Sequence, residues 1–157
     1  MKSKLYYIYL GIVLFVAFSL TSKQAVAQDS ELQRTTIMQY VINERPVLAE
    51  LLTTAGMAPA LSGSTAYTLL MPPEASLQEL KGQPVETIRA VMAMHLIKGT
   101  LSATDFKEGS RLQTNGSASL NVCRKKDNTL LNGVQLHTAD IALRNGRVHE
   151  LGGVLQP

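Results

Sequence analysis

Three Asn-Gly pairs lie in the last third of this chain, at residues 115–116, 132–133 and 145–146. An Asn-Gly pair between apolar stretches is the strongest short-range signal for a β-hairpin, because both central residues of a type I′ turn need positive φ. Apolar and polar residues alternate around these pairs, most clearly in Ser119–Lys125. The pattern predicts an antiparallel meander that is buried on one face.

Upstream of this region, apolar residues recur with a helical period instead. The expected elements are a helix capped by Thr35-Thr36 that runs through Asn43, a helix from Pro46 to Ala55, a loop at residues 57–66, a strand at Tyr67–Met71, a short helix at Glu74–Leu80 and a helix from Pro84 to Met94. The strand is apolar on both faces, which is typical of a central, covered strand. We expect Val85, Ile88 and Val91 to lie in the buried stripe of the last helix. Helices that precede a block of strands predict one α+β domain.

The first 27 residues have the features of a secretory signal peptide. Lys2 and Lys4 precede an apolar run from Ile8 to Leu20. Ala25-Val26-Ala27 then supplies a small-x-small cleavage site. The run is shorter than the roughly 20 apolar residues that a membrane-spanning helix needs. We therefore expect cleavage after Ala27, a single domain at residues 28–157, and a secreted or periplasmic protein, or one held at the cell surface, without a stable membrane anchor.

Removal of this segment leaves a chain with balanced charges. Of its 15 Lys and Arg residues, those at positions 2, 4 and 23 lie in the signal segment, whereas none of its 12 Asp and Glu residues does. The remaining 12 of each sign give no basic surplus for a nucleic-acid surface. Arg124-Lys125-Lys126 is followed by Asp127, and we interpret it as a solvated turn. Nucleic acid is therefore not an expected partner.

The segment Tyr67–Leu80 resembles the first signature motif of fasciclin-like domains. Thr68, Pro72 and the spacing of the apolar residues match the family pattern. Pro73 and Glu74 depart from it, since the family usually has Thr and then Asn or Asp at these positions. Thr would normally cap the following helix, so we expect this helix end to be stabilised in another way.

The segment Asn145–Pro157 resembles the second signature motif, with an Asn-Gly pair, an apolar-His pair and a terminal Val-Leu-x-Pro strand. With similar segments between the two motifs, the resemblance spans residues 35–157 and identifies a single-domain, secreted member of bacterial type. The residues to which we assign a structural role in the motifs are Thr68, Pro72, Asn145, Gly146 and His149.

The resemblance implies both a fold and a class of function. The fold is α+β, a wedge of about seven strands flanked by N-terminal and central helices. The function is that of a non-catalytic secreted module for cell adhesion or extracellular-matrix interaction, with an unidentified protein or glycan as its partner. In animal relatives, integrin contact is attributed to an Asp-Ile pair and to a Tyr-His region. The corresponding candidates for partner contact here are Asp140, Ile141 and His95, and Met94 replaces the Tyr.

The side chains that could support catalysis are few. His95 ends an apolar helix, where a buried hydrogen-bonding role is the simpler interpretation, and His137 is expected to face solvent. Cys123 is unpaired and expected to be partly exposed, and no base can be assigned to it. The three histidines have no recognised zinc spacing. We therefore expect no enzyme activity, no cofactor and no metal.

Two other functions stay open on the sequence. A carrier for an apolar small molecule or a glycan would need a deep cavity between the helices and the sheet. A thiol- or histidine-dependent hydrolase would need Cys123 within hydrogen-bond reach of a histidine.

Overall fold

The computed structural model describes residues 30–126 and 128–157 of the chain. Residues 35–157 form one compact unit. The expected signal peptide, residues 1–27, lies outside the described residues. The elements given below belong to this unit.

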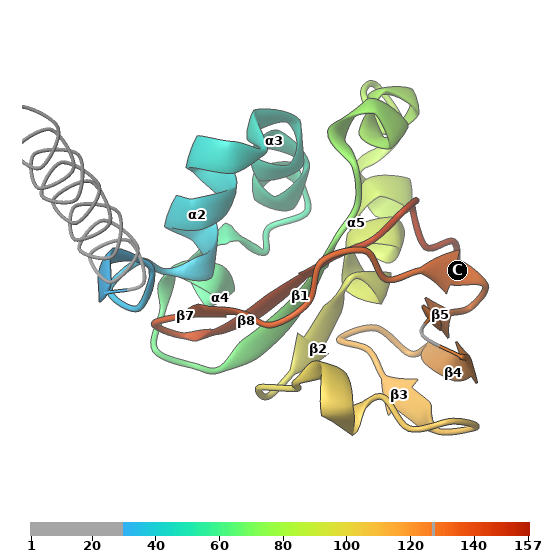
Figure 1. The fold of residues 1–157 in the computed structure, drawn as a ribbon. Coiled ribbons are helices and arrows are strands. Elements are labelled where there is room, and N and C mark those ends of the chain that lie inside the picture. Colours follow the sequence, from blue (N-terminus) through green and yellow to red (C-terminus); the bar gives the residue numbers. More distant parts are fainter. Residues whose placement is uncertain (1–29, 127) are drawn as a thin grey trace, which may run out of the picture. The chain divides into compact units, whose positions relative to one another are not determined.

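Helices occupy the first half of this unit (Figure 1). They are α2 (Ile37–Glu44), α3 (Pro46–Thr54), α4 (Ala58–Ser62), the 3-10 helix η1 (Glu74–Leu80) and α5 (Val85–Met94), and a short 3-10 helix η2 (Ala103–Asp105) follows later. The four predicted helices are confirmed to within one residue at each end. The loop expected at residues 57–66 is wrong in part, because it contains α4, which is anchored by the fully buried Leu61. Residues 57–66 are mostly small or polar, so their sequence does not indicate this helix of little more than one turn.

The buried stripe of α5 begins at Ile88, one residue of the predicted stripe later than expected. Ile88 and Val91 are buried as expected. Val85 was expected beside them but is 44% exposed. It is the first residue of the helix, before the turns that pack on the rest of the domain.

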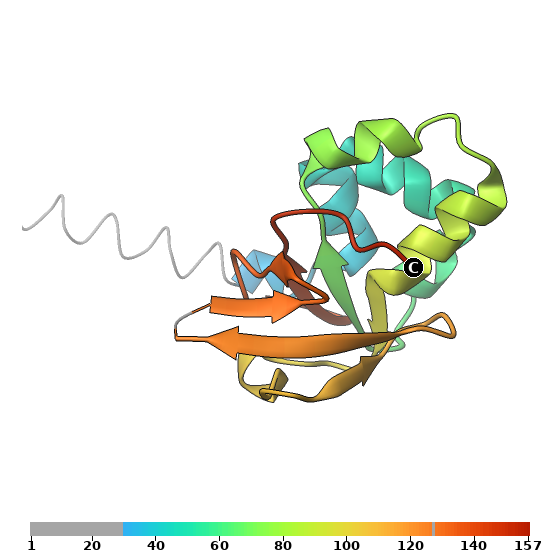
Figure 2. The ribbon, with the colours of Figure 1, turned by 90° about the vertical axis from the view of Figure 1, so that its right-hand side faces the viewer.

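Among the described residues, eight strands form two four-stranded sheets. In spatial order, the first sheet contains β2 (Leu96–Lys98), β1 (Tyr67–Met71), β8 (Gly146–Glu150) and β7 (Ile141–Leu143). The second contains β3 (Arg111–Gln113), β4 (Ser119–Lys125), β5 (Asn128–Leu131) and β6 (Val134–Gln135), and Figure 2 shows its longer strands side by side. This is the expected α+β architecture, with strands close to the expected number.

Strand β1 is central and covered, as predicted. It pairs antiparallel with β2 and parallel with β8, in a register that runs from Tyr67 beside Gly146 to Met71 beside Glu150. The expectation of one C-terminal meander is therefore wrong in part: β3 to β6 form it, whereas β7 and β8 belong to the first sheet. Alternation along a strand defines its two faces but not its neighbours, so this pairing was not visible in the pattern.

Only one of the three Asn-Gly pairs forms the predicted two-residue turn. Asn132 and Gly133 have φ of 48° and 85° and join β5 to β6. Asn115 and Gly116 lie instead in a longer connection between β3 and β4. The pair at 132–133 therefore has the backbone that its residue types favour.

The third Asn-Gly pair is displaced from the turn centre by one residue. Leu143 pairs with Gly146, so Arg144 and Asn145 are the turn residues, and neither has positive φ. Gly146 begins β8 with φ of 147°, and a Cβ atom on it would lie 1.8 Å from the carbonyl oxygen of Tyr67. This glycine is required for the close approach of β8 to β1 rather than for the hairpin turn.

Side chains stabilise the starts of two helices. Thr36 and Gln39 form a reciprocal capping box at α2, in which Gln39 N donates to Thr36 Oγ1 and Thr36 N to Gln39 Oε1. Helix α3 receives its cap from elsewhere in the chain, because Val47 N donates to Glu74 Oε1 across 2.5 Å. The departure from the family pattern at Glu74 thus serves α3, while Pro73 contributes only its carbonyl to η1.

A hydrophobic core joins the helical half of the domain to the C-terminal ribbon. Leu70 of β1 and Met94 of α5 pack in one cluster with Leu151 and Leu155, which follow β8. The other buried members are Ile97, Phe106, Leu120, Val122 and Leu131. The C-terminal ribbon and the earlier half of the domain therefore share one interior.

Candidate functional site

His149 is fully buried on β8 and is hydrogen-bonded through both ring nitrogens. The backbone N–H of Asp140 donates to Nδ1 across 3.1 Å, and Nε2 lies 2.8 Å from the carbonyl oxygen of Leu101. Since Nδ1 accepts, the ring proton is on Nε2 and donates to Leu101. The ring of Phe106 packs edge-on at a centroid distance of 5.1 Å. Burial lowers the pKa of His149, so the ring is neutral. In this form it links the main chain at Asp140 to the main chain at Leu101.

Asp140, whose main-chain N–H donates to His149, lies at the surface. Its backbone has φ of 66°, in the left-handed region that Asp tolerates better than most residues. Both carboxylate oxygens accept from the N–H of Ala103, at 3.1 and 3.3 Å, and one also pairs with Arg147 at 2.8 Å. The Asp140 side chain keeps 37% of its surface exposed. It therefore combines a structural contact with a face that a partner can reach.

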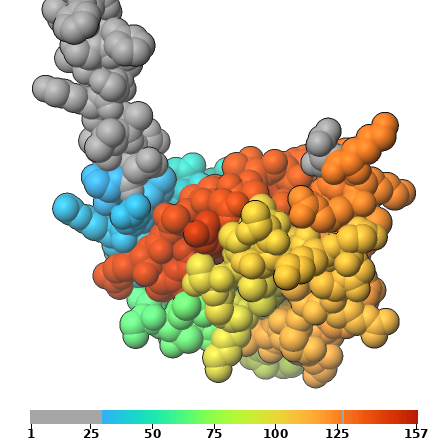
Figure 3. All heavy atoms as spheres, turned by 60° about the horizontal axis from the view of Figure 1, so that its bottom comes forward, coloured from blue at the N-terminus to red at the C-terminus, as the bar shows by residue number. Residues whose placement is uncertain are grey.

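Thr68 completes this network on β1. Its buried hydroxyl donates to the carbonyl oxygen of Gly99 and accepts from the N–H of Leu101, both at 2.8 Å. The segment from Gly99 to Ala103 is thus held by Thr68, His149 and Asp140 in turn. Figure 3 shows this segment, in yellow, lying against the β7–β8 hairpin, in red. Two of the three holding residues come from the motifs that the sequence singled out for structural roles.

Asn145 is buried and holds the first helices against the closing hairpin. Its Oδ1 accepts from the N–H of Ile37, the first residue of α2, across 2.8 Å. Its Nδ2 donates to the carbonyl oxygens of Leu61 and Gly63, at 2.8 and 2.9 Å. The side chain therefore satisfies three main-chain groups that secondary structure leaves free.

His95 does not lie at the surface. It is fully buried, Nδ1 lies 2.8 Å from the carbonyl oxygen of Val91, and Nε2 accepts from the N–H of Leu155 across 3.0 Å. Burial lowers its pKa to about 4. The expectation that His95 contacts a partner is corrected, because no part of its side chain reaches the solvent.

The remaining motif and contact candidates lie close to the network. Ile141 is half-buried in β7 and pairs with Val148 of β8. Pro72 is buried immediately after β1. The structure thus brings Asp140 and Ile141 together at the edge of the first sheet and leaves His95 in the interior.

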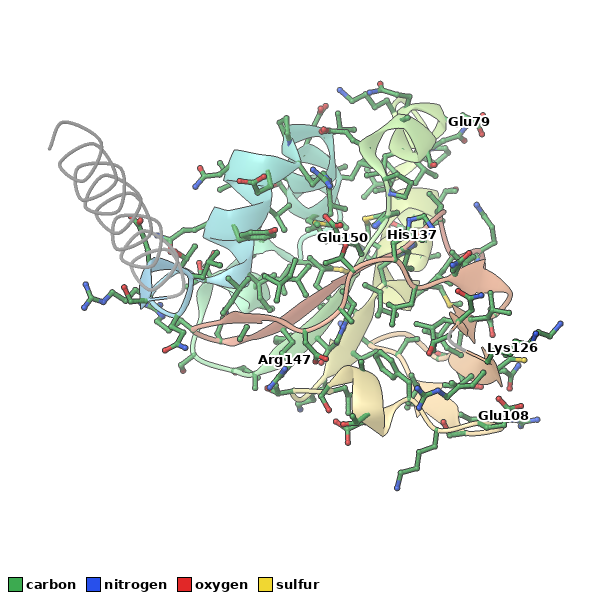
Figure 4. The ribbon with its side chains drawn as sticks, viewed as in Figure 1. Glu79, Glu108, Lys126, His137, Arg147 and Glu150 are labelled. Atoms are coloured by element: carbon green, nitrogen blue, oxygen red, sulfur yellow. The ribbon has the colours of Figure 1, made fainter. Side chains whose placement is uncertain are left out.

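The other residues considered for chemistry are apart from this network. His137, labelled in Figure 4, is exposed as expected, with its ring against the backbone of Gly152. Its main-chain N–H donates to the main-chain carbonyl oxygen of Glu150. Cys123 is half-buried on β4, and within residues 30–126 and 128–157 no hydrogen bond joins it to a histidine. In that same part of the chain no three metal-ligating side chains gather, and no helix is long and apolar enough to span a membrane.

Arg147 and Ala103, which hold the Asp140 carboxylate, were not among the residues that the sequence interpretation named. Arg147, labelled in Figure 4, carries the charge that faces Asp140, and Ala103 offers the N–H. The hairpin pairing of Ala142 with Arg147 could have placed the arginine near Asp140. The contact with Ala103 spans 37 residues and has no local signal.

Comparisons with known proteins agree with this geometry. The family model described as the fasciclin domain matches residues 43–157. Among solved structures, the chain is similar to a FAS1 domain pair from the insect cell adhesion molecule fasciclin I, with a TM-score of 0.62 and 14% identity. The match covers 80% of this chain and 52% of the insect structure, so the chain spans about half of that domain pair. Such a low identity shows a shared fold, and the family match over most of the sequence establishes that the chain belongs to the fasciclin domain family.

Proposed function

We propose that this protein is an exported adhesion module that binds a protein or glycan at the cell surface or in the surrounding matrix. The observation that carries the proposal is the fasciclin match over residues 43–157. Fasciclin domains are generally adhesion modules, and the insect relative in the solved structure is itself a cell adhesion molecule.

The roles of the polar side chains support a binding function rather than a chemical one. His95 and His149 each use both ring nitrogens to hold main-chain groups. A general base must have a nitrogen free to take a proton from its substrate. These two residues instead stabilise the fold through hydrogen bonds to the main chain, so recognition of a partner falls to the outer surface.

We place the contact surface at the start of β7. Asp140 and Arg147 form an ion pair with both side chains about one-third exposed, and Ile141 lies beside them half-buried. An ion pair at the rim of an apolar edge gives a partner both a charge pattern and an apolar contact.

Adhesion of cells from the producing organism to beads coated with the purified protein tests the proposal. We expect the folded coating to retain cells, and a heat-unfolded coating or an unrelated domain of similar size not to do so. Equal retention on all three coatings would contradict an adhesive function.

Two arginines of the same hairpin provide a matched pair for the contact surface. Arg147 pairs with Asp140, whereas Arg144 is exposed in the adjoining turn. Arg147→Gln should reduce retention, and Arg144→Gln should leave it unchanged, with circular dichroism confirming that both variants fold. Reduction by both variants alike would place the contact elsewhere.

Export depends on residues 1–27 acting as a signal peptide. The intact mass of the protein recovered outside the cytoplasm should correspond to a chain that starts at Gln28. Ala27→Arg should block this cleavage, since the site needs a small residue there. A full-length exported chain would contradict cleavage but not adhesion.

A further inference from the structure

Three Asn-Gly pairs occur in this chain, and the fold gives them three different environments. We propose that Asn115 is a site of spontaneous deamidation in the folded protein, whereas Asn132 and Asn145 are protected by their hydrogen bonds. The modification requires only water, and it converts a neutral side chain into a carboxylate at one defined loop.

The reaction takes place within the Asn-Gly pair itself. The main-chain nitrogen of the glycine loses its proton and attacks the side-chain carbonyl carbon of the asparagine. A carbon–nitrogen bond forms, the bond to the side-chain amide nitrogen breaks, and ammonia leaves with the proton. Water then opens the resulting succinimide ring at either carbonyl, giving aspartate or isoaspartate. Glycine favours the attack because it has no Cβ to obstruct ring closure.

Both reacting groups of the first pair are unengaged. Asn115 is exposed in the connection between β3 and β4, and in the described part of the chain neither its side-chain amide nor the N–H of Gly116 has a hydrogen-bond partner. Only the main-chain N–H of Asn115 is held, by the carbonyl oxygen of Leu96 at 2.6 Å. The side chain can therefore rotate onto the nitrogen of Gly116 without first breaking a contact.

The second pair is restrained by one side-chain contact. The Oδ1 atom of Asn132 accepts from the N–H of Asn121 across 2.8 Å. Its left-handed backbone is also fixed by the pairing of Leu131 with Val134 on either side of the turn. Ring closure here requires loss of the contact with Asn121.

The third pair is closed to the reaction. The side chain of Asn145 is buried and holds Ile37, Leu61 and Gly63 through three hydrogen bonds. The carbonyl oxygen of Asn145 also accepts from the N–H of Tyr67 across 3.1 Å, so the main chain at this junction is held on β1 as well. Each hydrogen bond that must break first slows the reaction roughly fivefold. We expect deamidation at Asn132 to be at least about fivefold slower than at Asn115, and that at Asn145 more than about a hundredfold slower.

Modification at Asn115 changes the loop that carries it. In isoaspartate the side-chain Cβ of residue 115 becomes part of the main chain. The main chain between the N–H of residue 115, which donates to Leu96, and Gly116 is then one carbon longer. A Cβ atom built on Gly116 would lie 3.3 Å from the Cβ of Ala93, so this part of the loop is already closely packed on the end of α5. The longer backbone should therefore release the contact with Leu96 and loosen the β3–β4 connection.

Peptide mapping by mass spectrometry of the purified full chain, incubated at mildly alkaline pH, tests the proposal. We expect modified Asn115 to accumulate first, with Asn132 second and Asn145 unmodified over the same period. A parallel incubation in guanidinium chloride removes the fold, and there the three sites should react at similar rates. Faster reaction at Asn132 or Asn145 than at Asn115 in the folded protein would overturn the proposal.

Two variants test independently of the peptide map that the early modification occurs at Asn115. Asn115→Gln should abolish the early modification, since the longer side chain closes a less favourable ring. Asn132→Gln, the matched control in the other exposed pair, should leave it unchanged. Persistence of the early signal in Asn115→Gln would also overturn the proposal.

Discussion

The backbone N–H of Asp140 donates to Nδ1 of His149, nine residues further along the chain, across 3.1 Å. This contact makes the surface aspartate and the buried histidine parts of one structure. The carboxylate of Asp140 holds Ala103, and the other ring nitrogen of His149 holds Leu101. A change at either residue is therefore transmitted to the same segment.

Acid should destabilise this domain between about pH 6.5 and pH 4. Burial lowers the pKa of His95 from 6.5 to about 4 and lowers that of His149 as well. The unfolded chain binds these protons first, so the stabilisation is fully present above pH 6.5 and is lost as the pH falls through the folded-state pKa. For His95 alone the loss amounts to about 3 kcal/mol.

Chemical denaturation at a series of pH values measures this loss. The exposed His137 supplies the control variant, because His137→Gln leaves both buried rings in place. A free energy of unfolding that is constant from pH 7 to pH 4 would contradict the neutral, buried state of these two rings.

Substitutions at Asp140 should separate its charge from its backbone contact. Asp140→Asn keeps an oxygen for Ala103 and tolerates the left-handed φ, so it loses only the ion pair with Arg147, worth less than about 1 kcal/mol. Asp140→Ala also leaves the N–H of Ala103 without its acceptor and strains the backbone, for a loss of about 2 kcal/mol. Thermal and chemical unfolding compare the two variants, and equal losses would show that the charge alone matters.

Asn145→Ala should be among the most damaging polar substitutions in the domain. It leaves the N–H of Ile37 and the carbonyls of Leu61 and Gly63 without partners, for a loss of about 3 kcal/mol or more. Asn145→Asp should be no better, because a carboxylate would face two carbonyl oxygens. Asn115→Ala is the control, expected within about 0.5 kcal/mol of the native stability.

Alanine at two glycines with positive φ should have very different effects. Gly133→Ala meets no atom within 4 Å and should cost about 1 kcal/mol for its left-handed backbone. Gly146→Ala would place a Cβ 1.8 Å from the carbonyl oxygen of Tyr67 and should prevent β8 from pairing with β1. Far-ultraviolet circular dichroism and solubility distinguish a weakened fold from a lost one. Similar stability of the two variants would contradict the close approach at Gly146.

Local patterns predicted much of this fold because they report local physics. The cap at Thr36, the proline at the start of α3 and the apolar run of β1 each act within a few residues, and the elements lie where these signals place them. Leu61 shows the opposite case, since one buried leucine in a short helix carries too little periodicity to be recognised.

The candidate site was predicted by residue but not by arrangement. Asp140 and His149 were both singled out, yet the contact between them depends on the β7–β8 register. The resemblance made His95 a candidate for partner contact, whereas its position at the end of an apolar helix indicated a buried hydrogen-bonding role. The structure confirms the buried role, and the N–H of Leu155 in the terminal segment donates to its ring. A motif residue alone does not indicate whether a later segment of the chain will bury its side chain.

The sequence by itself determined four of the helices, the covered strand β1, the α+β class and the family, since these depend on periodicity and motif residues that can be read one segment at a time. Only the tertiary structure decided that β8 lies parallel to β1, that Glu74 caps α3 and that three Asn-Gly pairs have three different roles. These features join residues far apart in the chain, and a contact at such separation is selected by the packing of the whole core rather than by the preferences of its own residues.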